Sequence, residues 1–141
     1  MCMQTFTEKL EVSTSGELDI IDITGRIQEI VKRSRVRDGT VTVFVAGSTA
    51  AITTIEYEPG LRSDMQRALS MLFPKDLEYE HHKRWGDYNG HSHIRASFIG
   101  PSITIPITDS SLTLGRWQQV VLIELDVTPR RRSLVVKIMG E

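Results

Sequence analysis

The chain has 141 residues, 40% hydrophobic and 25% charged, which is the usage of an ordinary globular protein. Seventeen basic and eighteen acidic side chains leave a formal charge of −1, which argues against nucleic acid or a membrane surface as a partner. The lone Cys2 excludes an intramolecular disulfide and a cysteine metal cluster. Because the sequence contains neither a signal peptide nor an apolar stretch of membrane-spanning length, we expect a cytoplasmic protein with one domain over residues 1–141.

The first segments alternate between apolar and polar residues. Residues 4–12 and 17–24 are predicted strands, and the turn-forming "STSG" between them predicts an opening hairpin. Thr24 is the expected cap of a helix over residues 25–35. Spacings of three and four residues place three apolar side chains on one face of that helix: Ile27, Ile30 and Val31.

An apolar strand and a second helix are predicted next. Residues 39–46 form the expected buried strand, and after a Gly-Ser-Thr turn a further strand ends near Glu56. Pro59 opens a helix that Pro74 ends. The apolar stripe of this helix is expected to consist of Leu61, Met65, Leu69 and Leu72.

Residues 75–89 have many polar side chains and little periodicity, so a long loop is predicted. A short helix over 91–100 is expected to begin near His91 or Ser92 and to end at Gly100. Long loops within compact domains are commonly functional, and this one therefore directs attention to its reactive side chains.

The C-terminal part of the chain is dominated by β-branched residues. Strands are predicted over residues 102–107, 112–115, 117–127 and 133–140. The two tryptophans, Trp85 and Trp117, are expected to act mainly as packing anchors. The fold class is α+β, with a mainly antiparallel β-sheet covered by two or three helices.

All four histidines of the chain lie within thirteen residues: His81, His82, His91 and His93. Imidazole titrates near neutral pH and is the commonest metal ligand, so with Asp87 and Glu56 this cluster indicates either a metal site or an acid–base pair. The spacing does not decide between them. His82 and His91 are interpreted as ordinary polar loop residues, since neighbouring side chains of an extended segment point apart.

A second pattern is the turn Gly47, Ser48 and Thr49 at the end of the buried strand. Backbone N–H groups and two hydroxyls in such a turn can bind a phosphate oxygen, although an ordinary turn is equally consistent. Guanidinium groups suit bidentate phosphate binding, and those considered as partners are Arg95, Arg116 and Arg132.

Taken in order and spacing, "FVAGSTAAITTIEYEPGL", "YEHHKRWGDYNGHSHIRASFIGPSITIPI", "LTLGRWQQVVLIELD" and "RRRSLVVKIMGE" resemble the YjbQ-like family of secondary thiamine-phosphate synthases. The resemblance covers nearly the whole chain. It implies a YjbQ-like α+β fold, a homotrimer, and an active site of polar residues in a cleft between subunits.

The resemblance also implies candidate site residues. His81 matches the histidine of the family's "YEH" element, and His93 matches that of "SHIK" or "SHLK". Asp87 or Asn89 lies at its acidic or amide position, and Glu56 matches a glutamate that follows the family's first histidine. Catalytic roles are therefore expected for His81, His93, Glu56 and Asp87.

Further residues match the family's motifs, but two positions differ from them. Asp64 matches an acid on the helix after Glu56, while Trp117 and Gln118 match the "GTWQ" turn, in which Arg116 replaces the usual threonine. Many members have "HTTA" or "HTSA" where this chain has "GSTA", so Gly47 replaces a histidine. Substrate binding is expected from Gly47, Ser48, Thr49, Asn89, Arg95, Arg116, Trp117, Gln118 and Arg132.

The loss of that histidine leaves a three-histidine metal site incomplete. His81 and His93 with an acid such as Asp64, Glu56 or Asp87 could still bind a divalent ion, magnesium, manganese or zinc. The resemblance implies a phosphorylated substrate and a transferase that joins a pyrimidine methyl diphosphate to a thiazole phosphate. The alternatives are a non-enzymatic trimer that binds a metal or a phosphorylated metabolite, and a metal-dependent hydrolase.

Overall fold

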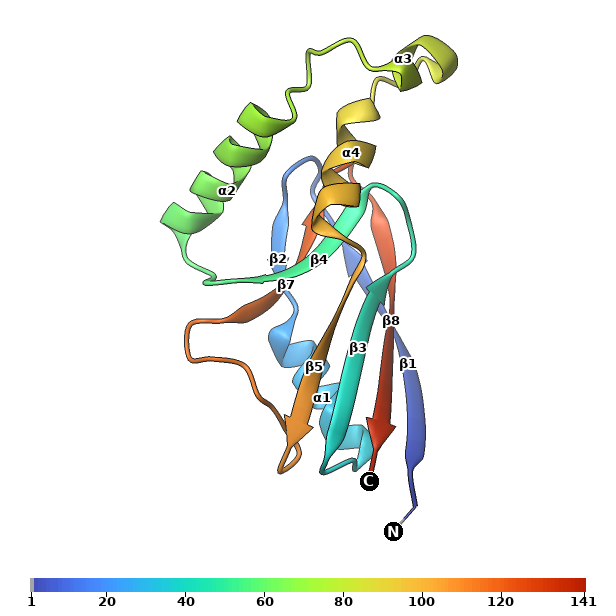
Figure 1. The fold of residues 1–141 in the computed structure, drawn as a ribbon, viewed down its shortest axis with the longest axis vertical. Coiled ribbons are helices and arrows are strands. Elements are labelled where there is room, and N and C mark those ends of the chain that lie inside the picture. The colour runs from blue at the N-terminus through green and yellow to red at the C-terminus, as the bar shows by residue number, and fades with distance from the viewer. Residues whose placement is uncertain (1) are drawn as a thin grey trace.

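The computed structural model describes residues 2–141, which form four helices and two antiparallel sheets. The larger sheet has the strand order β1-β8-β3-β5-β6, and the smaller has the order β2-β7-β4 (Figure 1). The elements are β1 (Gln4–Ser13), β2 (Ile20–Asp22), α1 (Thr24–Ser34), β3 (Gly39–Val45), β4 (Ala50–Ile55), α2 (Pro59–Leu72), α3 (Glu80–Trp85), α4 (Gly90–Ile99), β5 (Ser102–Thr108), β6 (Ser111–Leu112), β7 (Gln119–Glu124) and β8 (Arg131–Gly140). The expected α+β class with antiparallel sheets is confirmed.

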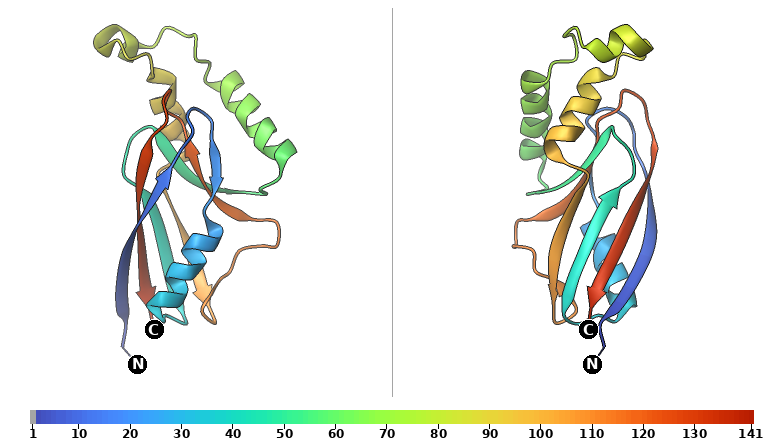
Figure 2. Two further views of the ribbon diagram at one scale, coloured as in Figure 1. Left: turned by 180° about the vertical axis from the view of Figure 1, so that it is seen from behind. Right: turned by 45° about the vertical axis from the view of Figure 1, so that its right-hand side comes forward.

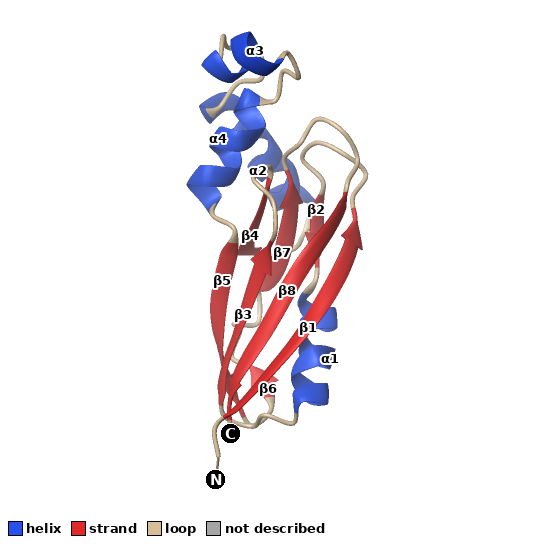
Figure 3. Ribbon diagram, turned by 90° about the vertical axis from the view of Figure 1, so that its right-hand side faces the viewer, coloured by secondary structure: helices blue, strands red, loops and turns tan. Residues whose placement is uncertain are grey.

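The helices divide between the two ends of the molecule. Both termini and α1 lie at one end, whereas α2, α3 and α4 gather at the other (Figures 1 and 2). Seen from the side, α1 runs along one face of the large sheet, and the small sheet lies beyond it toward α4 (Figure 3). Among residues 2–141, no helix combines the length and apolar character needed to cross a bilayer.

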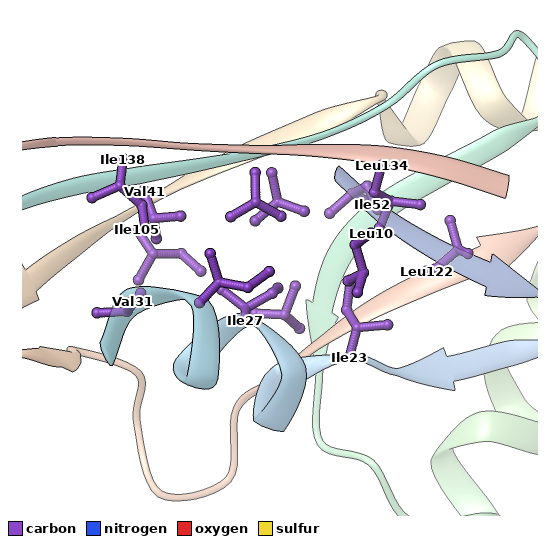
Figure 4. Packing of buried hydrophobic residues seen from close by; sticks show 14 of the residues in the cluster. Leu10, Ile23, Ile27, Val31, Val41, Ile52, Ile105, Leu122, Leu134 and Ile138 are labelled. Atoms are coloured by element: carbon purple, nitrogen blue, oxygen red, sulfur yellow. The ribbon is translucent and has the colours of Figure 1, made fainter. Parts of the chain in front are cut away.

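Two apolar clusters hold these layers together. The larger joins α1 to both sheets, and Ile27 and Val31 of α1 point at Val41 and Ile105 of the large sheet (Figure 4). The smaller cluster packs α2 and α4 on the outer face of the small sheet, for example Leu69. The central strand β7 is buried on both faces, whereas β8 alternates between buried and accessible residues. This difference follows because β7 is covered on both sides, and the large sheet on only one.

The predicted opening hairpin is wrong. β1 pairs with β8 in the large sheet, and β2 pairs with β7 in the small one. The intervening segment crosses between the sheets: the Thr14 N–H donates to the carbonyl of Arg130, and the Leu18 N–H to that of Glu124. Leu18 has a φ of 65°, so the segment turns away from β1 instead of folding back along it.

Helix ends also differ from the predictions. Thr24 is the first residue of α1 instead of its cap, and its hydroxyl accepts a 2.8 Å hydrogen bond from the N–H of Val120. The loop predicted over 75–89 contains α3, and α4 begins at Gly90 after Asn89. Leu72 is 70% exposed, so the predicted stripe of α2 fails at its last turn.

The strand predictions near the C terminus hold in part. β5 and β8 match the predicted segments, whereas β6 keeps only Leu112 of the predicted 112–115. Trp117 precedes β7 and is 64% exposed, and Trp85 is 66% exposed. The prediction that both tryptophans are packing anchors is therefore wrong.

A close approach of backbones predicts an effect on stability. Gly39 and Gly140 face each other across β3 and β8, and a Cβ on Gly39 would overlap the Met139 carbonyl. Gly39→Ala is expected to lower the free energy of unfolding by about 1–3 kcal/mol. Gly25→Ala on α1, where a Cβ meets nothing within 4 Å, should instead raise it by about 0.5 kcal/mol. Urea denaturation of both variants measures the two changes. Equal changes in the free energy of unfolding for Gly39→Ala and Gly25→Ala would contradict the prediction.

Candidate functional site

Two histidines from different helices meet at the end of the molecule away from the termini. α3 carries His81 and α4 carries His93, and their ring centroids lie 4.6 Å apart. Nδ1 of His81 lies 3.4 Å from Oδ1 of Asp87 but makes no hydrogen bond within residues 2–141. The structure therefore gathers three of the residues expected to be catalytic.

A turn places the acid of this group. The αL residue Gly86, with φ 71°, ends α3, and its N–H donates to the carbonyl of His82. Asp87 follows directly, which brings its carboxylate back toward the first turn of α3. Asn89 then precedes α4 and is 7% exposed.

Asn89 links the start of α4, the helix that carries His93, to a buried acid: its backbone carbonyl accepts a hydrogen bond from the His93 N–H at 3.3 Å. Its Nδ2 donates to Oδ1 of Asp126 at 3.3 Å, whereas its Oδ1 has no partner within the described chain. Burial alone would raise the pKa of Asp126, but hydrogen bonds from the Val127 N–H, Asn89 and Arg130 outweigh it and hold this pKa below its usual value. Asp126 therefore remains a carboxylate beside the site.

Asp126 is also hydrogen-bonded to a buried network of charged and polar groups. The guanidinium of Arg132 donates to Glu124 and, at 3.0 and 2.9 Å, to the carbonyl and hydroxyl of Thr49. The Asp126 N–H donates to Oε2 of Glu124, and the Thr49 hydroxyl donates to Asp126 at 3.3 Å. These bonds connect the turn after β3 to the end of β7.

The remaining residues of that turn lie against α4. Gly47 and Ser48 line a pocket of about 160 Å³ together with Ala96 and Ser97. Gly47 has a φ of 150°, and a Cβ there would lie 3.1 Å from the guanidinium of Arg132. A side chain in place of Gly47 would therefore be strained and would press on the charge network.

The other predicted residues do not join the histidine pair. Glu56, Arg116 and Trp117 line a separate pocket of about 290 Å³. Glu56 comes before α2 and His81 after it, and a helix of fourteen residues is about 20 Å long. Gln118 holds the preceding turn, since its Oε1 accepts from the Gly115 N–H and its Nε2 donates to Thr54.

The predicted metal ligands are also divided. Asp64 lies on α2 with its side chain 57% exposed and pairs with Arg67 at 2.9 Å. Within residues 2–141, no three His, Cys, Asp or Glu side chains are arranged to hold a metal ion. The predicted set of His81, His93 and Asp64 is therefore not assembled in one chain.

Two interpretations of basic residues change in the folded chain. Arg95 is 1% exposed and donates to the carbonyl of Phe73 at 3.1 and 2.9 Å, so it is not open to a substrate phosphate. His91 is fully buried beside Glu17, which corrects its interpretation as an ordinary loop residue. Glu124 and Asp126 were not among the predicted site residues, although an acid directly after the apolar run "VVLI", as at Glu124, is an unusual residue to bury and could have drawn attention to this strand end.

Two histidines have lowered pKa values. Burial lowers the pKa of His93, and His81 lowers it further against the opposing pull of Asp126 and Asp87. Burial is also the main cause of the lowered pKa of His91, which Glu17 opposes. At neutral pH both imidazoles are therefore uncharged.

This predicts acid sensitivity. Below the ordinary histidine pKa of about 6.5, His91 and His93 are protonated in the unfolded chain but stay neutral in the folded chain until the pH is lower. The free energy of unfolding therefore falls as the pH falls. Urea denaturation between pH 7.5 and 5 should show this loss, and His91→Gln should make the profile flatter. A profile unchanged by His91→Gln would contradict the prediction.

The fold and the histidine pair define a small α+β protein with a polar site between two helices. The model of the family described as "UPF0047 protein YjbQ-like" matches residues 8–141, so the chain belongs to the YjbQ-like family. It is 37% identical over 139 residues to a UPF0047 protein of Methanothermobacter thermautotrophicus, covering 99% of this chain and 95% of that protein.

Solved structures agree with this assignment. A YbjQ-like protein of unknown function from Sulfolobus solfataricus is 33% identical, with a TM-score of 0.95 over 99% of this chain and all of that one. An uncharacterized protein from Clostridium acetobutylicum, described as of the YjbQ/UPF0047 family, is 36% identical, with a TM-score of 0.80 over 94% of this chain and 98% of that one.

Proposed function

We propose that the chain is a transferase of the thiamine-phosphate synthase type and that His81 and His93 form its acid–base centre. The observation that carries this proposal is the meeting of the two imidazoles, 4.6 Å apart, beside Asp87. The family resemblance supplies the reaction class. Neither the fold nor the names of the relatives specify a reaction, so the activity needs its own test.

The proposed reaction joins a pyrimidine methyl diphosphate to a thiazole phosphate. A thiazole ring nitrogen attacks the methylene carbon, the carbon–oxygen bond breaks, and diphosphate leaves with the bonding electrons. A protonated imidazole, His81 or His93, gives its proton to the leaving oxygen. Because the pKa of His93 is lowered by burial, this imidazole is uncharged at neutral pH and must take up a proton before it can act as the acid. Asp126 and Asp87 favour that uptake.

The leaving diphosphate needs further positive charge. Arg95 is buried and Arg132 is paired with Glu124, so two of the three arginines predicted to bind phosphate are used within the chain. The third, Arg116, lines the separate pocket with Glu56. Within one chain the two imidazoles and Asp87 do not complete a metal site, and a divalent ion therefore stays a prediction. Magnesium is commonly held by carboxylates together with substrate phosphates, which makes the diphosphate itself the natural further ligand.

The division of the predicted site supports a homotrimer. Glu56 and Trp117 line a pocket remote from His81, so a site with all these residues would need two chains. α4 also turns apolar side chains outward, with Phe98 74% and Ile94 40% exposed. A second copy that covers this face would bury apolar surface, and native mass spectrometry should show three chains per particle.

The activity test uses the purified full chain with both phosphorylated precursors, with and without magnesium, manganese or zinc. Thiamine phosphate detected by mass spectrometry supports the proposal. Release of diphosphate or phosphate without thiazole phosphate would favour a hydrolase instead. Saturable binding of a precursor with neither product would favour a non-enzymatic binding protein.

A further inference from the structure

A pocket of about 290 Å³ adjoins α3 and takes no part in the proposed reaction. Its walls include three rings, those of Tyr79, His82 and Tyr88. The His82 ring centroid lies 5.3 Å from that of Tyr79 and 5.2 Å from that of Tyr88. A pocket of this size suits one small ligand, and its aromatic walls offer faces for stacking.

Two of the three rings are fixed by hydrogen bonds. The Tyr79 hydroxyl donates to the carbonyl of Pro74 at 2.7 Å. The Gly90 N–H donates to Nε2 of His82 at 3.0 Å, so neutral His82 carries its proton on Nδ1. Gly90 also allows this approach, since a Cβ there would lie 2.6 Å from Cβ of Tyr79. These two walls are therefore preorganised.

The third ring is exposed and its backbone is strained. Tyr88 has a φ of 54°, a conformation that costs a non-glycine residue free energy. Its side chain gains little burial in return, because the residue is 66% exposed. Glycine would suit the backbone better, so folding alone does not account for a tyrosine at this position.

The side chains that line the pocket include two ammonium groups and two carboxylates, those of Asp76 and Glu78. Lys75 lies 3.1 Å from Glu17, and Lys83 lies 3.1 Å from Glu80. Both lysine side chains are more than half exposed, at 62% and 55%, so these ion pairs are screened by water. Either ammonium can therefore exchange a carboxylate for an anionic group of a ligand.

From this geometry we infer that the pocket binds the planar heteroaromatic ring of a small ligand that carries an anionic group. The ring stacks on the exposed ring of Tyr88, and the anion pairs with Lys83 or Lys75. The inference does not depend on the proposed reaction, and thiamine-phosphate formation plays no part in its test.

Binding is tested by calorimetry on the full chain with three probes: cytidine 5′-monophosphate, cytidine and ribose 5-phosphate. The nucleotide should bind best, since only it has both the ring and the phosphate. In amide NMR spectra it should shift signals of residues 75–79 and 86–90. Equal affinity for ribose 5-phosphate and the nucleotide, or no binding of any probe, would overturn the inference.

Variants separate stacking from charge. Tyr88→Gly relieves the strain but removes the ring, so affinity for the nucleotide should fall roughly tenfold while the melting temperature does not fall. Tyr88→Phe keeps the ring and should retain affinity. Lys83→Met should weaken binding of the nucleotide but not of cytidine, and Lys32→Met on α1 should change neither. Unchanged nucleotide affinity in Tyr88→Gly would refute the stacking role.

Discussion

His93→Ala is expected to slow thiamine-phosphate formation roughly 100- to 10,000-fold, because it removes one partner of the proposed acid–base pair. His81→Ala should have an effect of similar size. Since the two rings act as a unit, the double variant should be little slower than either single variant. Product formation under single-turnover conditions, followed by mass spectrometry, measures these rates.

Glu80→Gln is the matched control for these variants. Glu80 adjoins His81 on α3, but its side chain is 87% exposed and pairs with Lys83. Thiamine-phosphate formation by Glu80→Gln should stay within about twofold of the rate of the unchanged chain. The circular dichroism spectra of all variants should match that of the unchanged chain. A His93→Ala protein that retains full activity would remove the proposed catalytic centre.

Arg132→Ala is expected to lower the free energy of unfolding by about 3–5 kcal/mol, since it leaves a buried charge without its partner. Glu124 has no exposed surface, and it accepts hydrogen bonds from Arg132, Thr14 and the backbone of Asp126. Without the guanidinium, Thr49 also loses the bonds that hold its turn. Urea denaturation at pH 7.5 measures the change.

Two further variants test whether the loss of stability in Arg132→Ala comes from the unpaired buried charge. Arg131→Ala removes a neighbouring arginine that is 75% exposed and lies 3.5 Å from Glu11, and it should change stability by less than about 0.5 kcal/mol. The double variant Glu124→Leu, Arg132→Met replaces the buried pair by apolar groups and should recover much of the loss. Equal losses in Arg131→Ala and Arg132→Ala would contradict a role for buried charge.

Local patterns were sufficient to predict much of the fold. The three- and four-residue spacing in α1 predicted its buried face, and Ile27, Ile30 and Val31 are all fully buried. The apolar run in β3 likewise predicted a strand, but only Val41, Val43 and Val45 on one face are buried, and Phe44 is 41% exposed. The hairpin failed because strand pairing is a contact distant in sequence: β1 pairs with the last strand, and a local turn sequence carries no information about that partner.

The end of α4 shows a different limit. Ile94 and Phe98 lie one helical turn apart, yet Phe98 is exposed and the side chains buried on this helix include Arg95 and His91. The burial of Arg95 depends on the carbonyl of Phe73 and on Glu17, which lie far from it in the sequence. Periodicity alone therefore finds the helix but not its orientation.

The candidate site was predictable only in part. The clustering of histidines and the family motifs pointed to His81 and His93, and the structure brings these two rings together. Glu56 and Asp64 carried the same motif support but lie elsewhere in the chain, because motif order does not report distance in space. Asp126 was missed since its role depends on Asn89 and Arg130, neighbours that only folding supplies.

The most direct test of a shared histidine site is an NMR titration of His93 in the unchanged chain and in His81→Gln. Because the charge on His81 lowers the pKa of His93, removing that charge should raise the pKa of His93 toward its ordinary value. An identical His93 titration in both proteins would show that the two imidazoles do not interact, and would contradict the proposed centre.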